Sequence, residues 1–97
     1  MPTYAWFATF RKGFDALSPE NQATFLSAVS HFVEDLENGK GFRKGLRVKG
    51  IQGASGIFEM TWANNGRATF EYGQPLRDGE LHVIWRRIGT HSIFDRP

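Results

Sequence analysis

Three histidines, His31, His82 and His91, are the side chains of this sequence best suited to exchange protons near neutral pH. An unperturbed imidazole has a pKa near 6.5, so it can serve as a general acid or base. His91 stands out because it follows Gly89-Thr90 and precedes Ser92-Ile93-Phe94, beyond the last expected strand. This context predicts either a proton-transfer residue or an ordinary surface histidine in a C-terminal tail.

The sequence argues against several other chemistries. It has no cysteine, which removes thiol nucleophiles, disulfides and thiolate metal sites. The histidines lack metal-ligand spacing such as His-x-x-x-His, and there is no Gly-x-x-x-x-Gly-Lys-Ser/Thr loop for phosphate. Gly50, Gly53 and Gly56 precede an expected strand instead of following one, so they indicate a bulge or a close backbone approach. We therefore expect neither a metal nor a cofactor.

The positive charges are concentrated in one block of the chain. The formal net charge is only +2, but residues 39–58 carry five cations and no acid, whereas residues 1–38 carry two cations and five acids. The block consists of Lys40, Arg43, Lys44, Arg47 and Lys49. Such a cluster favours phosphate or an acidic protein as partner, although a solvated loop and strand edge would have the same composition.

The length of 97 residues, with 40% hydrophobic side chains, predicts one globular domain spanning residues 1–97. The longest run without a charge, the 13 residues from Asn21 to Val33, is shorter than the roughly 20 apolar residues of a membrane span. The N-terminus lacks the basic start and apolar core of a secretory signal. We therefore expect a cytoplasmic protein without a membrane contact.

The first part of the chain predicts a strand and two helices. Tyr4–Phe10 is aromatic and prone to form a strand, and the spacing of the apolar residues in Arg11–Leu17 fits a short helix. Ser18 followed by a proline and an acid predicts the start of a long helix over Pro19–Asn38. Gly39 can end that helix in a left-handed conformation.

The remainder predicts strands at Leu46–Ile51, Ile57–Ala63, Arg67–Tyr72 and Leu81–Ile88. Alternation in the first would project Arg47 and Lys49 from one face. Asn64-Asn65-Gly66 would supply the left-handed residues of a tight hairpin. The expected fold is α+β, with an N-terminal strand and a helical hairpin packed on one face of a mainly antiparallel sheet of about four strands.

Several short motifs resemble the RelE/ParE superfamily of bacterial toxins, most closely its YafQ-like and YoeB-like ribosome-dependent mRNA interferases. The run from Arg87 to Phe94 is similar to the histidine-bearing end of these toxins. Ser55–Glu59 resembles the entry to their second strand, and Gly66–Tyr72 resembles their third. Val48–Gly50 resembles the Leu-Lys-Gly element that precedes the second strand, and Leu17–Glu20 resembles the start of their second helix. Order and spacing agree over nearly the whole chain, which implies a RelE-like fold.

The resemblance implies cleavage of mRNA in the ribosomal A site by attack of a ribose 2′-hydroxyl on the adjacent phosphate. This reaction needs a base, cations at the phosphate and an acid for the leaving oxygen. By matching position, His91 would be the acid or base and Arg67 would clamp the phosphate. Lys49 would share the role of Arg67. The expected partners are this mRNA and a cognate antitoxin, and the oligomeric state stays open.

A second set of residues would hold the RNA without taking part in catalysis. Phe94 would stack on a base, and cations would contact the backbone. The predicted RNA-contacting residues are Arg43, Lys44, Arg47, Arg86, Arg87 and Phe94.

The sequence also departs from these toxins. Where some relatives carry lysines it has Phe58 and Met60, and it lacks a glutamate found in others, so no second proton-transfer group is matched. His82 and Glu59 are the available substitutes. A binding-only relative, which poisons gyrase or binds only its antitoxin and operator, is therefore the alternative. A generic single-strand binder with an aromatic sheet face is a third reading.

Overall fold

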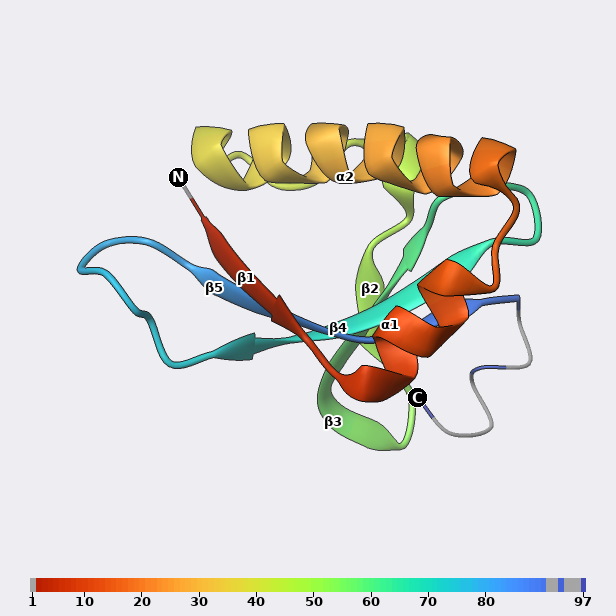
Figure 1. Ribbon diagram of the computed structural model, residues 1–97. Helices are drawn as coiled ribbons and strands as arrows, with labels where there is room; N and C mark the ends of the chain where they lie inside the picture. The colour runs from red at the N-terminus through yellow and green to blue at the C-terminus, as the bar shows by residue number, and fades with distance from the viewer. Residues whose placement is uncertain (1, 91–92, 94–96) are drawn as a thin grey trace.

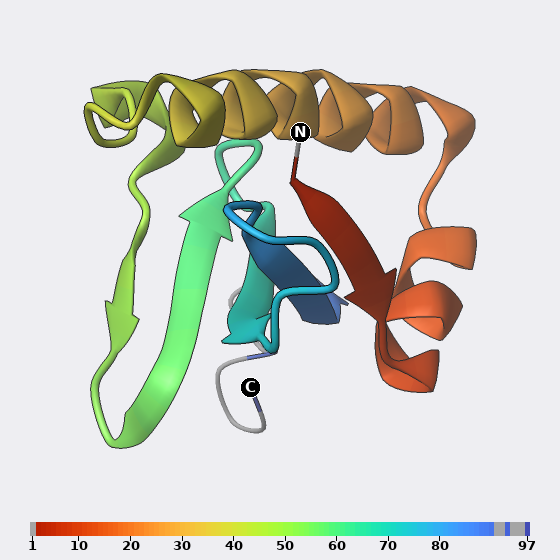
Figure 2. The same cartoon turned by 90° about the vertical axis from the view of Figure 1, so that its left-hand side faces the viewer.

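The computed structural model describes residues 2–90, 93 and 97. The elements in chain order are β1 (Thr3–Trp6), α1 (Ala8–Asp15), α2 (Pro19–Asn38), the 3-10 turn η1 (Lys44–Leu46), β2 (Lys49–Ile51), β3 (Ala54–Thr61), β4 (Arg67–Gly73) and β5 (His82–Gly89). Among the described residues five strands form one sheet in the order β1-β5-β4-β3-β2 (Figures 1 and 2). β1 is parallel to β5, and the other neighbours are antiparallel. The predicted α+β class is confirmed, with the N-terminal strand as a fifth member of the sheet.

The long helix α2 begins and ends where the sequence predicts. Ser18 Oγ accepts a hydrogen bond from the Asn21 backbone N–H at 3.1 Å, and Pro19 occupies the first turn, where no N–H is needed. Gly39 ends the helix with a φ of 67°, which glycine adopts without strain. The helix lies across one face of the sheet (Figure 1). Neither described helix has the length and hydropathy that a membrane crossing requires.

The core lies between the helices and one face of the sheet. Phe32 of α2 packs against Phe70 and Trp85, with ring centroids 5.0 Å and 5.3 Å apart. The pairing of β4 with β5 shifts between Thr69 and Phe70, which leaves Arg86 as an extra residue on β5. Because of this bulge, both Trp85 and Ile88 are buried on the helix side. The side chains of Arg86 and Arg87, which lie between Trp85 and Ile88 in the chain, belong to the face turned away from α2.

Several predicted boundaries are wrong, among them that of β3, which spans Ala54–Thr61 instead of Ile57–Ala63. β1 ends at Trp6 and α1 already begins at Ala8, because Phe10 is buried from the helix against Phe25 and Trp85. The predicted strand Leu46–Ile51 is also shorter. The chain forms η1 there, Arg47 is left-handed with a φ of 48°, and pairing starts only at Lys49. Arg47 and Lys49 therefore do not project from one strand face.

The turn between β3 and β4 is built differently from the prediction. Asn64, Asn65 and Gly66 all have negative φ angles, so the expected left-handed hairpin is wrong. The Trp62 N–H donates to the Gly66 carbonyl, and the Gly66 N–H donates to the Ala63 carbonyl. A Cβ added at Gly66 would lie 2.5 Å from the Trp62 ring. Glycine is required here for space and not for its backbone freedom.

Replacing Gly66 by alanine should lower the free energy of unfolding by about 1–3 kcal/mol, the usual cost of overpacking. Urea denaturation measures this difference. Gly45→Ala is the matched control, because a Cβ there meets nothing within 4 Å and the backbone is not left-handed. Its effect should stay within about 0.5 kcal/mol. Equal losses for the two variants would contradict the steric explanation.

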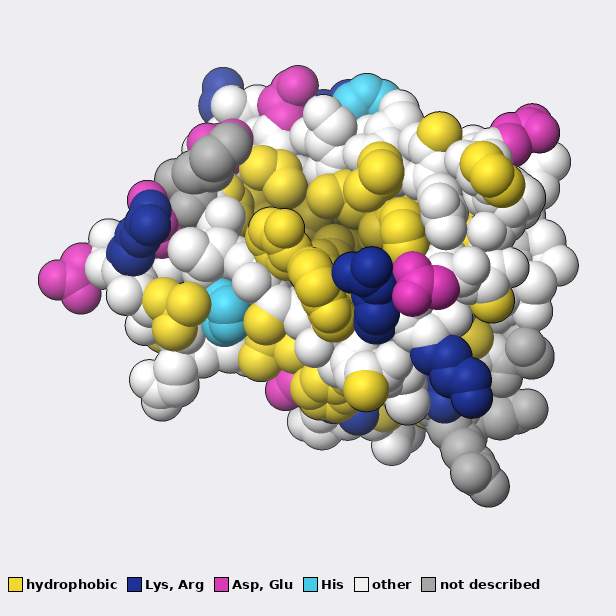
Figure 3. Space-filling view, in the orientation of Figure 1, with side chains coloured by type: hydrophobic (Ala, Val, Ile, Leu, Met, Phe, Trp, Pro, Cys, Tyr) yellow, Lys and Arg dark blue, Asp and Glu magenta, His cyan; other side chains and the backbone are white. Residues whose placement is uncertain are grey.

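A hollow with apolar walls lies between α2 and β1 and faces the viewer in Figure 3. We call it the apolar groove. Its volume is about 420 Å³. α2 does not cover the edge strand fully, so Tyr4 remains 65% exposed, Trp6 44% and Leu26 56%. The other walls come mainly from Phe14, Val29, Val33 and Leu36.

Candidate nucleic-acid interface

The sheet face turned away from α2 carries a row of polar side chains. Phe58, Phe70 and Trp85 face the helix side, so their neighbours along each strand point to the other side. Strand pairing aligns Lys49 with Glu59, Glu59 with Thr69, and Thr69 with Arg87. This row crosses β2, β3, β4 and β5. We call it, together with Glu71 and Arg86, the polar face.

Ion pairs hold much of the polar face in place. Lys49 Nζ lies 3.5 Å from Glu59 Oε1, and the Glu59 side chain is only 12% exposed whereas that of Lys49 is 64% exposed. Arg86 forms an ion pair with Glu71, and its guanidinium lies 4.8 Å from the centre of the Phe7 ring. Arg87 is half-buried and forms no ion pair with the described part of the chain.

The end of the chain returns to the polar face. The Pro97 carbonyl oxygen accepts hydrogen bonds from Thr69 Oγ1 and from Arg86 Nε, both at 3.1 Å. Ile93 is buried, at 6% exposure. His91 and Phe94, which the sequence assigns to catalysis and base stacking, lie outside the described residues. Their roles therefore stay predictions.

Arg67 is the first residue of β4 and lines a groove that is distinct from the apolar groove. Its Nη1 donates to the carbonyl oxygens of Ala63, Asn64 and Gly66 at 2.9–3.3 Å. Arg67 is paired in register with Gly89, two residues before His91. It also lines a groove of about 860 Å³ between α2, the segment 43–47 and the β3–β4 turn. We call this the cationic groove, since Arg43 and Arg47 line it as well.

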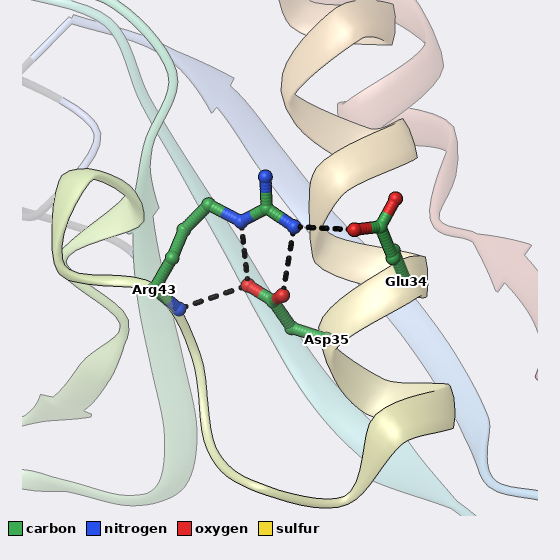
Figure 4. A network of polar contacts seen from close by, with 3 residues as sticks. All are labelled: Glu34, Asp35 and Arg43. Carbon is green, nitrogen blue, oxygen red and sulfur yellow. Dashed lines mark hydrogen bonds and ion pairs between the residues drawn. The ribbon is translucent and has the colours of Figure 1, made fainter.

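Arg43 is bound to α2, as Figure 4 shows. Its Nε and Nη2 donate to the two carboxylate oxygens of Asp35, at 3.0 and 2.8 Å, and Nη2 also reaches Glu34. The Arg43 backbone N–H donates to Asp35 as well, at 2.8 Å. The hydrogen bonds from Arg43 lower the pKa of Asp35 to about 2. Arg43 thus anchors the loop after α2, and much of its charge is already neutralised.

The Asp35–Arg43 pair should make the stability of the protein fall in acid. The pKa of Asp35 is depressed in the folded state, so the pair contributes fully above the ordinary aspartate value of about 3.9 and is lost as the pH falls towards about 2. Urea denaturation of the wild type and of Asp35→Asn between pH 5 and pH 2 measures the free energy of unfolding and so checks this pH dependence. The variant should be less stable at pH 5, and the difference should shrink in acid. A constant difference would contradict the linkage.

The remaining predicted residues are widely separated. Lys44 is exposed in η1. His82 is buried at the opposite end of β5 from Gly89, where its Nδ1 shares a 2.8 Å hydrogen bond with Thr3 Oγ1. Thr69 and Glu71 were not singled out from the sequence, although their alternation with buried residues of β4 was the available signal. Within the described residues no three acidic or histidine side chains are grouped as metal ligands.

Comparison with known proteins finds matches at the level of structure. No protein-family model and no curated protein matches the sequence. A YoeB/ParE toxin from Agrobacterium tumefaciens matches with a TM-score of 0.66 at 8% identity, over 92% of this chain and 98% of that one. The Escherichia coli DinJ-YafQ toxin-antitoxin complex gives 0.62 at 14% identity, over 94% and 93%. The RelB-RelE complex from Methanococcus jannaschii gives 0.58 at 18%, over 96% and 98%.

The chain has the RelE/ParE toxin fold. The RelE-like architecture expected from the sequence is thereby confirmed, and at these identities the likeness concerns the fold. On this RelE/ParE toxin fold, five of the described residues that the sequence assigns to catalysis or RNA binding lie in two places. Lys49, Arg86 and Arg87 belong to the polar face, and Arg47 and Arg67 line the cationic groove.

Proposed function

We propose that the protein is the toxin of a toxin–antitoxin system and cleaves mRNA on the ribosome. The observation that carries the proposal is the RelE/ParE toxin fold combined with cations on the helix-free side of the sheet. Register pairing places Arg67 beside Gly89, two residues from His91. A phosphate near this corner would meet an arginine from β4 and the start of the histidine-bearing segment.

The chemistry would proceed by attack of a ribose 2′-oxygen on phosphorus, with loss of the 5′-oxygen of the next nucleotide. One group must take the proton of the 2′-hydroxyl and another must protonate the leaving oxygen. Arginine and lysine stabilise the charge that builds on the phosphate oxygens. In this proposal His91 transfers one of the protons, and Arg67 and Lys49 supply the cations.

Glu59 is the better of the two candidates for the second proton-transfer group. It lies within the polar row beside Lys49, whereas His82 lies at the opposite end of β5 from Gly89 and is hydrogen-bonded to Thr3. A carboxylate within hydrogen-bond reach of a bound hydroxyl can accept its proton. In this mechanism Glu59 accepts the proton of the 2′-hydroxyl, and His91 protonates the leaving 5′-oxygen.

Purified protein added to translating ribosomes should produce new mRNA 5′ ends, and His91→Ala and Glu59→Gln should each lower the cleavage rate at least about 100-fold, the scale of general acid–base catalysis. Glu71→Gln is the matched control on the same face, since its carboxylate is already held by Arg86. Unchanged message with the wild-type protein would refute nuclease action. Growth arrest with DNA breaks and intact message would instead select the gyrase-poisoning alternative.

We also propose that the antitoxin covers the apolar groove. Three of the similar structures were solved as complexes of a toxin with its antitoxin. The groove exposes aromatic and aliphatic side chains in a contiguous hollow (Figure 3), which is typical of a protein-binding surface. A partner that buries Leu26 and Trp6 would gain stability from the hydrophobic effect.

The edge of β1 indicates the form in which the antitoxin binds. The N–H groups of Thr3 and Phe7 donate to Leu81 and Trp85, on the β5 side. Successive residues of a strand point their backbone groups in opposite directions, so Tyr4 and Trp6 present theirs to the outer edge. No described strand pairs with that edge. An extended segment of the antitoxin would pair there and insert alternate apolar side chains into the groove.

Leu26→Glu should weaken binding of the antitoxin at least about tenfold, because it places a charge against buried apolar surface. The binding partner in this test is the small protein encoded beside the toxin, and calorimetry measures its affinity. Leu76→Glu is the control: this leucine is 68% exposed but lies in the β4–β5 loop, outside the groove. Equal affinities of the two variants would refute this docking site.

A further inference from the structure

The cationic groove is separate from the polar face and is suited to an anion. It lies between α2 and the β3–β4 turn, and its lining combines cations with hydroxyl and amide groups. The uncharged polar lining includes Thr24, Ser27, Thr61 and Asn64. Among the described lining residues Glu20, near the start of α2, is the one acid. The volume of the cationic groove, about 860 Å³, exceeds what a single ion needs.

Arg47 is held in this groove in an unfavourable backbone conformation. Its φ of 48° makes it the one non-glycine residue with positive φ in the described part of the chain. The left-handed region is costly for a side chain with a Cβ, and glycine is the usual residue there. An arginine at such a position suggests that its side chain has a use that outweighs the strain. That side chain is exposed and lines the groove.

Arg67 is fixed on the other side of the groove. Three carbonyl oxygens of the β3–β4 turn hold its Nη1, and within the described residues no partner binds its Nε or Nη2. A guanidinium restrained in this way loses little side-chain entropy when it binds phosphate. Because Arg67 is paired with Gly89, it stands where the groove meets the end of β5.

We infer that the cationic groove binds the sugar–phosphate backbone of RNA, next to the phosphate that is cleaved. The inference rests on the proposed function, because it makes the groove a continuation of the substrate path. Arg67 forms the junction, Arg47 contacts a phosphate further along, and His31 and Ser27 of α2 flank it. Recognition through the backbone makes the groove tolerant of base sequence.

Affinity for RNA can be tested with two serines of α2. Ser27 lines the groove and Ser30 does not, and both are exposed. Ser27→Glu should weaken binding of a short single-stranded RNA about tenfold at low salt, and the effect should shrink as salt rises. Ser30→Glu should bind as the wild type does. The probe carries 2′-O-methyl groups, so it cannot be cleaved, and fluorescence anisotropy reports binding.

Arg47→Gly tests the strained residue. It should weaken RNA binding about tenfold and flatten the slope of log affinity against log salt by about 0.7. Because glycine adopts a positive φ without strain, the substitution should also raise the unfolding temperature by about 4 °C. Arg77→Gly removes an exposed arginine, paired with Glu80, from the β4–β5 loop and should change neither the RNA affinity nor its salt dependence. Wild-type affinity in both Ser27→Glu and Arg47→Gly would overturn the inference.

The outcomes separate this inference from the proposed function. If the wild type cleaves message on ribosomes but the groove variants bind RNA normally, the groove assignment fails alone. If no message is cleaved but the groove variants lose RNA affinity, the nuclease proposal fails and the groove remains an RNA site.

Discussion

The packing of Phe32 against Phe70 and Trp85 fixes how α2 lies on the sheet. The three ring centroids are 5.0–5.4 Å apart, a distance at which aromatic pairs contribute about 0.5–1.5 kcal/mol beyond burial. Because strand side chains alternate between faces, this contact also determines which residues cannot be in the core. Glu59, Thr69 and Glu71 are placed on the polar face by the same constraint.

Electrostatics then divides the cations into those that hold the fold and those that remain available. Arg43 is bound to Asp35, and Arg86 to Glu71, so these two belong to the architecture of the isolated chain. Lys49 is largely exposed although it is paired with Glu59. Arg47 lines a groove instead. The basic block of residues 39–58 is therefore not one surface, since its members point to α2, to the cationic groove and to the polar face.

The fold was predictable from local signals where those signals have one physical meaning. The Ser18-Pro19 start and the Gly39 end of α2 are examples, because capping and left-handed glycine depend on neighbouring residues only. Arg47, Gly66 and Arg43 were not predictable in this way. Their conformations depend on a 3-10 turn, on the Trp62 ring and on the Asp35 carboxylate, respectively. The types of the site residues could be predicted from the sequence. Their division between the polar face and the cationic groove could not.

The parallel pairing of β1 with β5 also constrains how the chain acquires this structure. Thr3 pairs with His82, so the first strand of the sheet finds its neighbour only in the last one. During synthesis β1 has neither edge covered, and Phe70 lacks its contact with Trp85, until β5 has been made. Contacts of such long sequence separation slow folding. The sheet can therefore be completed only after the residues of β5 have been synthesised.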